Sequence, residues 1–150
     1  MTDDLLYLED LSVGQTFHSG SITLSTDDIK AFASQFDPQP FHLDEEAARD
    51  TMFGGLAASG WHTAAITMRL IVDSGVRIAG GLIGLGADVT WPRPTRPGDE
   101  LRVRSEILEV TPSRSKPDRG IFTMRHETLN QHDQVMQVTI VKVLAMRRPV

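Results

Sequence analysis

The chain has 150 residues, a formal net charge of -5 and no cysteine. This acidic balance argues against general nucleic-acid binding, which needs a basic surface, and the lack of cysteine excludes disulfides and thiolate metal sites. Hydrophobic residues at 40% and charged residues at 23% are typical of globular proteins, so we expect residues 1–150 to form a single domain. The acidic start, MTDDLLYLEDL, does not resemble a secretory signal, and we expect a cytoplasmic protein without a membrane span.

The N-terminal part of the chain predicts strand followed by helix. Residues 11–24 favour one or two short strands around two glycines. Residues 25–27 are Ser, Thr and Asp, the types that cap helices, so they predict the start of a helix over residues 27–36. This helix must end at Asp37, because the residue before a proline avoids the helical region.

A stiff turn and a glycine-rich loop follow. Pro38 and Pro40 restrict residues 37–42, so this segment predicts an extended turn. Residues 43–51 predict a short helix with acidic residues in its first turn. The next nine residues, MFGGLAASG, predict a loop.

A central helix is predicted from Trp61 to about Val72, where apolar residues recur at three- and four-residue spacing. We expect this stripe to be buried as the helix packs against a sheet. Its members are Trp61, Ala64, Ala65, Met68, Ile71 and Val72.

The C-terminal half predicts four strands, because β-branched residues and alternation dominate there. The order of elements predicts an α+β domain in which an antiparallel sheet lays one face on the helix. A sheet around a single helix leaves edges and part of the helix uncovered, so we expect dimerisation. The strand segments are residues 82–91, 99–111, 120–130 and 134–146, and the glycines of the first read as strand bends.

Asp37 and His42 are the first candidates for chemistry. They lie five residues apart with two prolines between them, so few backbone conformations are available to them. A carboxylate and an imidazole beside one water can share the proton transfers of an addition or elimination. Taken alone, the pattern also fits an aspartate that ends a helix and a histidine packed against the turn.

Ser59 and Gly60 stand at the predicted start of the central helix. Backbone N–H groups there are unpaired and carry the positive end of the helix dipole, so they can hold an oxyanion. The alternative is a plain N-cap with a glycine for close packing. On the same helix we expect His62 to be a hydrogen-bonded core residue.

No metal or phosphate-loop site is indicated. The remaining histidines have no carboxylate or second histidine at ligand spacing. The segment GGLIGLG lacks the ending of a P-loop. The basic residues within residues 93–119 are the only candidates for an anionic ligand, with solvated strand faces as the alternative.

The segment Asp37-Pro38-Gln39-Pro40-Phe41-His42-Leu43-Asp44 resembles the signature of the MaoC-like, or (R)-specific enoyl-CoA hydratase, family. Ser59-Gly60 resembles the pair that opens that family's central helix, eighteen residues after the catalytic histidine. Residues 90–107 resemble its strand and Pro-Gly-Asp turn, so the likeness runs over nearly the whole chain.

This resemblance implies a hot-dog fold, a curved antiparallel sheet around a long central helix, in a homodimer or higher assembly. It implies reversible addition of water to a trans-2-enoyl-CoA. Asp37 and His42 would activate the water, the Gly60 amide would hold the thioester oxygen, and Ser59 and Gln39 would join Gly60 in binding the oxyanion or the substrate. No cofactor is expected besides the coenzyme A of the substrate.

The sequence departs from the family pattern at two positions. Gln39 replaces the commoner asparagine, and its amide still offers a hydrogen bond. Met68 stands where some members carry a supporting serine, a role that Thr67 or Thr63 would take over. We also expect Arg93 and Arg96 to contact the phosphates of coenzyme A.

Two other functions stay open at this point. Hot-dog acyl-CoA thioesterases usually carry an acidic residue on the central helix, and here the first is Asp73 at its end. A non-catalytic acyl-thioester binding subunit would have lost Asp37 or His42, and both are present. The pattern therefore favours the hydratase.

Overall fold

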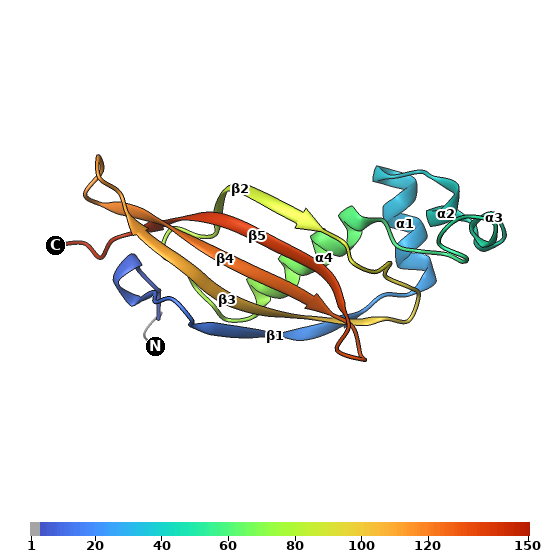
Figure 1. Cartoon of the computed structure of the whole chain (residues 1–150), viewed down its shortest axis with the longest axis horizontal. Coiled ribbons are helices and arrows are strands. Elements are labelled where there is room, and N and C mark those ends of the chain that lie inside the picture. The colour runs from blue at the N-terminus through green and yellow to red at the C-terminus, as the bar shows by residue number, and fades with distance from the viewer. Residues whose placement is uncertain (1–3) are drawn as a thin grey trace.

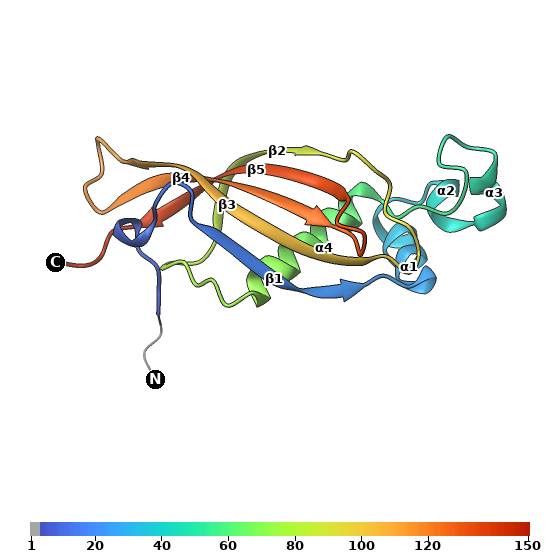
Figure 2. The ribbon, with the colours of Figure 1, turned by 60° about the horizontal axis from the view of Figure 1, so that its bottom comes forward.

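A computed structural model describes residues 4–150 and contains a single antiparallel sheet with one long helix along it (Figure 1). The strand order is β1-β3-β4-β5-β2. Helix α4, Gly60–Asp73, lies along one face of this sheet in both views (Figure 2). The predicted α+β arrangement is therefore confirmed. The strands are β1 (Thr16–Thr23), β2 (Ile83–Thr90), β3 (Glu100–Pro112), β4 (Arg119–Leu129) and β5 (Val135–Met146).

Three short helices gather beyond the end of the sheet at which α4 begins (Figure 1). They are α1 (Thr26–Phe36), α2 (Pro40–Leu43) and α3 (Glu45–Arg49). A 3-10 turn, η1 (Leu8–Asp10), precedes β1 and had no clear signal in the sequence.

Helix α1 begins and ends as its sequence predicts. Ser25 Oγ accepts a hydrogen bond from the Asp28 N–H at 3.1 Å, and the Asp28 carboxylate accepts one from the Ser25 N–H at 3.2 Å. Asp37 is the residue at which the helix ends, before Pro38.

The extended turn predicted over residues 37–42 is wrong in its second half. Pro40 opens α2, because its fixed φ and missing N–H suit the first position of a helix. His42 is therefore presented from a helical turn and is buried.

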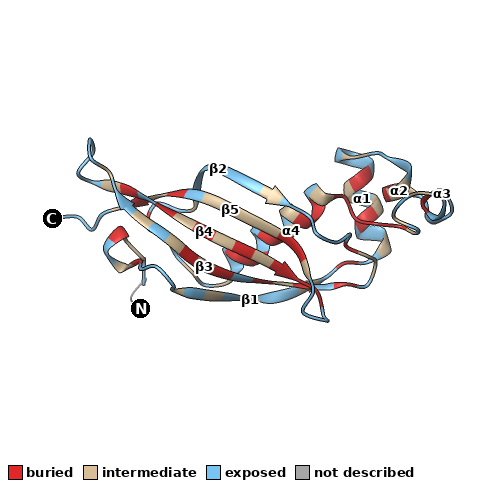
Figure 3. Ribbon diagram, viewed as in Figure 1, coloured by how far each residue is buried: buried red, intermediate tan, exposed pale blue. Residues whose placement is uncertain are grey.

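Strand β2 is an edge strand in which seven of eight residues are exposed and the other is half-buried (Figure 3). Its pairing with β5 shifts register between Gly84 and Gly86, which confirms the strand bend predicted there. Strand β1 forms the other edge. The backbone groups along both edges are open to further pairing.

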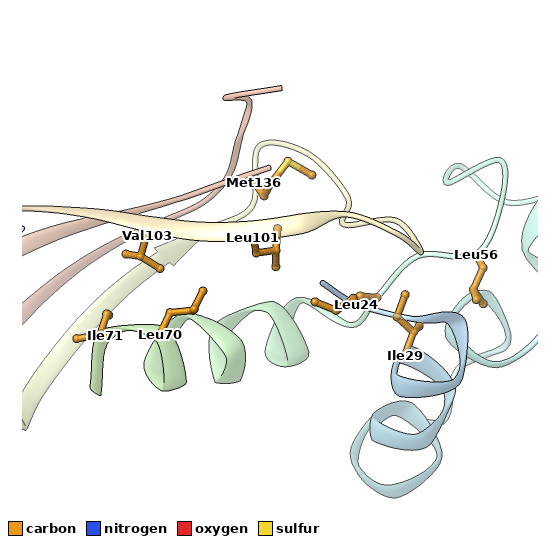
Figure 4. Close-up of a cluster of buried hydrophobic side chains, with 9 residues drawn as sticks. Leu24, Ile29, Leu56, Leu70, Ile71, Leu101, Val103 and Met136 are labelled. Carbon is orange, nitrogen blue, oxygen red and sulfur yellow. The ribbon is translucent and has the colours of Figure 1, made fainter. Parts of the chain in front are cut away.

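The C-terminal turns of α4 contribute buried aliphatic side chains to the core between this helix and the sheet. Leu70 and Ile71 point toward Leu101 and Val103 of β3 (Figure 4).

No helix within residues 4–150 is long and apolar enough to span a bilayer.

The stripe of α4 predicted as buried faces outward at most of its positions. Trp61, Met68 and Val72 are 62%, 53% and 58% exposed, and Ala65 is exposed as well. Spacing reveals which residues share a face and not which face meets the sheet. The buried face contains threonines whose hydroxyls hydrogen-bond to threonines of other segments, which lowers the cost of burying them. Its members are His62, Thr63, Thr67, Leu70 and Ile71.

Candidate active site

Asp37, at the end of α1, and His42, within α2, lie side by side. The Asp37 N–H closes the last turn of α1 by donating to the Ala33 carbonyl at 2.8 Å. His42 Nε2 is 3.3 Å from Asp37 Oδ2, and the two side chains are 6% and 17% exposed. A carboxylate and an imidazole this close, and largely shielded from solvent, can act on the same water.

The Asp37 carboxylate is held by two further hydrogen bonds. Gln39 Nε2 donates to Oδ1 at 2.5 Å, and Ser59 Oγ donates to Oδ2 at 2.7 Å. Burial alone would raise the pKa of Asp37, but these two bonds and the charge of His42 outweigh it and hold the pKa below its ordinary value. Asp37 is therefore a carboxylate at neutral pH.

The backbone fixes the orientation of the His42 ring. Nδ1 lies 2.6 Å from the Ala57 carbonyl oxygen. A carbonyl oxygen only accepts, so Nδ1 carries the proton in the neutral ring. Nε2, which faces Asp37, then has a free lone pair. The ring of Phe41 meets the imidazole edge-on, with centroids 4.6 Å apart.

Gly60 begins α4 directly after Ser59, next to this pair. No hydrogen bond within residues 4–150 uses the Gly60 N–H, as expected in the first turn of a helix. The indole of Trp91 lies against Gly60, where an added Cβ would be 2.7 Å from Trp91 Cε2. Glycine therefore fits here without displacing the ring, and its N–H stays available to a ligand oxygen.

These groups line one cavity of about 480 Å3. That volume is in the range of small-molecule sites, which combine apolar walls with a few placed polar groups. The walls include Phe41, Phe53, Trp61 and Trp91, and the polar groups include Asp37, His42, Thr63 and Thr95.

A family model described as MaoC like domain matches residues 10–130. This chain belongs to the MaoC-like dehydratase family. It resembles the solved MaoC-like dehydratase from Rhodospirillum rubrum at 59% identity with a TM-score of 0.94, over 97% of this chain and 99% of that one. The hot-dog fold expected from the sequence is confirmed by this likeness and by the curved antiparallel sheet along α4.

Two other relatives of this MaoC-like chain cover most of its length. The uncharacterized protein YdeM of Bacillus subtilis is 38% identical over 129 residues, which are 84% of this chain and 89% of that protein. The 3-hydroxybutyryl-CoA dehydratase of Methylorubrum extorquens is 33% identical over 114 residues, 75% of this chain and 70% of that protein. The second is named for a dehydration of a coenzyme A thioester.

The two departures from the MaoC-like pattern have different outcomes. The amide of Gln39 reaches Asp37, as the sequence suggested. Met68 lies on the exposed side of α4. The hydroxyls of Thr63 and Thr67 bond to other threonines and not to the Asp37–His42 pair. The hydroxyl that bonds to Asp37 is that of Ser59.

The two arginines expected to contact coenzyme A have different surroundings. Arg93 lines the cavity, is exposed and makes no hydrogen bond or ion pair within residues 4–150. Arg96 donates to the carbonyls of Phe53, Gly55 and Leu56, at 3.0 Å and 3.3 Å for the last two. Its guanidinium therefore stabilises the loop that contains Phe53, a residue of the cavity wall.

His62 is a core residue, as expected, but its hydrogen bonding was predicted wrongly. It is 8% exposed, and its ring stacks on Phe32 with centroids 4.5 Å apart. Nδ1 is buried and has no partner within the described residues. Burial lowers the pKa of His62, while the charge of Asp28 raises it, and the net shift is downward.

No local sequence pattern singles out Trp91 and Thr95 as residues of the site. Both reach the cavity because the segment that contains them runs beside the loop before α4, where the Ala58 N–H donates to the Thr95 carbonyl at 2.8 Å.

Within residues 4–150, no group of three or more His, Cys, Asp or Glu side chains is placed to hold a metal ion.

Proposed function

We propose that this protein is an enoyl-CoA hydratase, which reversibly adds water to the double bond of a trans-2-enoyl thioester of coenzyme A. The observation that carries the proposal is the presence of the Asp37–His42 pair and the unpaired Gly60 N–H in one cavity. A relative named 3-hydroxybutyryl-CoA dehydratase supports the reaction class. We place the reaction in the cytoplasm, with no cofactor besides the coenzyme A of the substrate.

In the proposed reaction, His42 moves the proton. Its Nε2 lone pair takes a proton from water while the water oxygen bonds to C3 of the enoyl group. The electrons of the double bond move toward the thioester carbonyl and form an enolate. The imidazolium then returns the proton to C2, so that one water has been added in total.

Asp37 and Gly60 stabilise the charges that develop. The low pKa of Asp37 keeps it ionised, so it orients the water and stabilises the imidazolium. The Gly60 N–H, at the positive end of α4, donates to the enolate oxygen. Ser59 and Gln39 hold the carboxylate in place.

The test is turnover of crotonyl-CoA and of longer or branched enoyl thioesters. Asp37→Asn and His42→Ala should each lower kcat by roughly 100- to 10,000-fold without unfolding the protein. His132→Ala is the matched control, because that exposed histidine lies in a turn outside the cavity.

Each rival function has its own outcome in this test. Release of free thiol from saturated acyl-CoA, with enoyl thioesters untouched, would establish a thioesterase. Binding of acyl-CoA without turnover of any thioester would establish a binding subunit.

We also propose that the protein is a homodimer that covers the outward face of α4. Trp61, Met68 and Val72 on this face, and Ile83 and Leu85 on the edge strand β2, are apolar and exposed. Met68→Glu should shift the sedimentation coefficient toward that of a monomer. Ile121→Glu, on the outer face of the sheet, should not. A monomeric wild type would exclude the dimer.

A further inference from the structure

The inner wall of the cavity carries buried hydroxyl groups that the proposed reaction does not use. Thr63 and Thr95 both line the cavity, and each is only 2% exposed. Thr63 Oγ1 donates a hydrogen bond to Thr95 Oγ1 at 3.0 Å. A buried hydroxyl without a partner is costly, so the partners of these groups have to be counted.

The hydroxyl protons of three buried threonines, Thr63, Thr67 and Thr128, all have an acceptor. Thr67 Oγ1 donates to the Thr63 carbonyl at 2.8 Å. The Thr67 hydroxyl has used its only proton in this bond. In its 2.6 Å hydrogen bond with Thr128 Oγ1 it must therefore be the acceptor, and Thr128 is the donor. This accounting leaves no free donor on Thr63, Thr67 or Thr128.

Gln137 joins the same network to the cavity wall. Its Nε2 donates to Thr139 Oγ1 at 3.0 Å and, at the longer distance of 3.4 Å, to Thr67 Oγ1. Its Oε1 accepts from Trp91 Nε1 at 2.9 Å. The network is therefore held in one arrangement, and it also fixes the indole that lies against Gly60.

The hydroxyl proton of Thr95 is the exception. Thr95 Oγ1 accepts from Thr63, and no hydrogen bond within residues 4–150 takes the Thr95 proton. Thr95 is thus a buried donor without an acceptor, on the lining of a cavity. An acceptor on a bound ligand would satisfy it.

The position of Thr95 indicates which part of a thioester would meet it. The phosphates of coenzyme A are charged and costly to bury, so the acyl end is the part that enters the cavity. Thr63 follows Gly60 by one turn of α4 and is buried, whereas Trp61 is mostly exposed. A thioester held at the Gly60 N–H would therefore direct its acyl chain past Thr63 and Thr95.

We propose that the Thr95 hydroxyl donates a hydrogen bond to the acyl chain, so that the preferred substrate carries an oxygen acceptor on its chain. This inference rests on the proposed function, since it assumes a thioester anchored at Gly60. The acceptor is a hydroxyl, carbonyl or carboxylate oxygen beyond C3. A plain alkyl chain would leave the Thr95 proton buried and unpaired.

The test measures binding rather than turnover, by titration calorimetry with saturated thioesters that cannot be hydrated. Straight-chain acyl-CoAs of four to six carbons are compared with the same chains bearing a terminal hydroxyl. Wild type should bind the hydroxylated member of at least one pair about 3- to 10-fold more tightly, the effect of one neutral hydrogen bond. Thr95→Val, which keeps the shape and removes the hydroxyl, should abolish that preference.

Thr128→Val is the matched control, since it removes a hydroxyl of the same network that does not line the cavity. It should keep the preference for the hydroxylated chain. Equal affinities in the wild type, or an equal loss of affinity for both chain types in Thr95→Val, would overturn the inference.

The binding measurements and the hydration assay distinguish failure of this inference from failure of the proposed hydratase activity. Hydration of crotonyl-CoA without any preference among the bound chains would overturn this inference and leave the hydratase in place. The preference without hydration of any enoyl thioester would overturn the hydratase and keep the acyl subsite. Binding of no thioester would count against both.

Discussion

Ser59 Oγ donates a 2.7 Å hydrogen bond to Asp37 Oδ2 and accepts one from the Trp61 N–H at 3.2 Å. The residue that caps α4 therefore also holds the carboxylate at the end of α1. The helix start, with its unpaired Gly60 N–H, and the Asp37–His42 pair are positioned by one side chain. A change at Ser59 should disturb both.

Ser59→Ala should lower kcat about 10-fold, because a hydrogen bond to a charged group contributes about 1.5 kcal/mol. It should also reduce the free energy of unfolding by roughly 0.5–2 kcal/mol through loss of the N-cap. Since the Ser59 bond lowers the pKa of Asp37, loss of that bond should raise this pKa. The kcat for crotonyl-CoA and a carbon-13 NMR titration of the Asp37 carboxyl group check these two effects.

Ser25→Ala is the matched control for this change. Ser25 caps α1 in the same way and lies outside the cavity. Ser25→Ala should lower the free energy of unfolding by a similar amount and leave both kcat and the pKa of Asp37 unchanged. The same shift in both variants would show that Ser59 acts only as a cap.

Gly60→Ala should impair both packing and activity. The added methyl group would lie 2.7 Å from Trp91 Cε2, so the indole or the helix start has to move. We expect a loss of roughly 1–3 kcal/mol in the free energy of unfolding, as for an overpacked core, and a lower kcat. Gly20→Ala is the control, because nothing lies within 4 Å of its added Cβ. An unchanged free energy of unfolding together with an unchanged kcat in Gly60→Ala would contradict this packing constraint.

Arg93→Gln should raise the KM for an acyl-CoA at low salt, if the exposed guanidinium attracts the phosphates of coenzyme A. The difference from wild type should shrink as salt is added, because the screening length falls to about 10 Å near 0.1 M. A KM equal to that of wild type at low salt would exclude Arg93 from binding.

Arg96→Gln should behave differently, because Arg96 bonds to backbone carbonyls of the loop at Phe53. Loss of these bonds should lower the free energy of unfolding, and any change in KM should be insensitive to salt. Urea unfolding and KM at two salt concentrations separate the two arginines.

His126 should make the folded state less stable as the pH falls from about 6.5 to about 4. Burial lowers the pKa of His126 to about 4, against about 6.5 for an exposed histidine. Between these values the unfolded chain binds a proton that the folded protein does not, so acidification favours unfolding by up to roughly 3 kcal/mol.

His126→Gln should therefore show a smaller loss of unfolding free energy between pH 7 and pH 4.5 than wild type. The glutamine still offers an atom to Ser105, whose Oγ lies 2.7 Å from Nδ1 of the histidine. The exposed His132→Gln should behave like wild type. Equal pH dependence in all three proteins would contradict the assignment.

Local signals predicted much of the fold. Ser25 and Pro38 mark the two ends of α1, and β-branched alternation gave the four later strands. The face of α4 was predicted wrongly, because Thr63 and Thr67 are polar by type and become buried only through partners on distant strands and loops.

Part of the candidate site could likewise be predicted from local sequence, and part could not. Asp37 and His42 share one proline-stiffened segment, so their proximity followed from the sequence. Trp91 and Thr95 come from a segment far along the chain, and their place in the cavity depends on contacts that no local pattern encodes. The bond from Ser59 to Asp37 likewise joins two separate helices.

The close contact of Gly60 with Trp91 has a consequence for variation among relatives. A larger residue at position 60 is compatible with this fold only where the residue at position 91 is smaller or its ring is displaced. The two positions should therefore change together in homologous chains. Because Gln137 holds the indole, it should be replaced together with Trp91, so that substitution at all three positions is correlated.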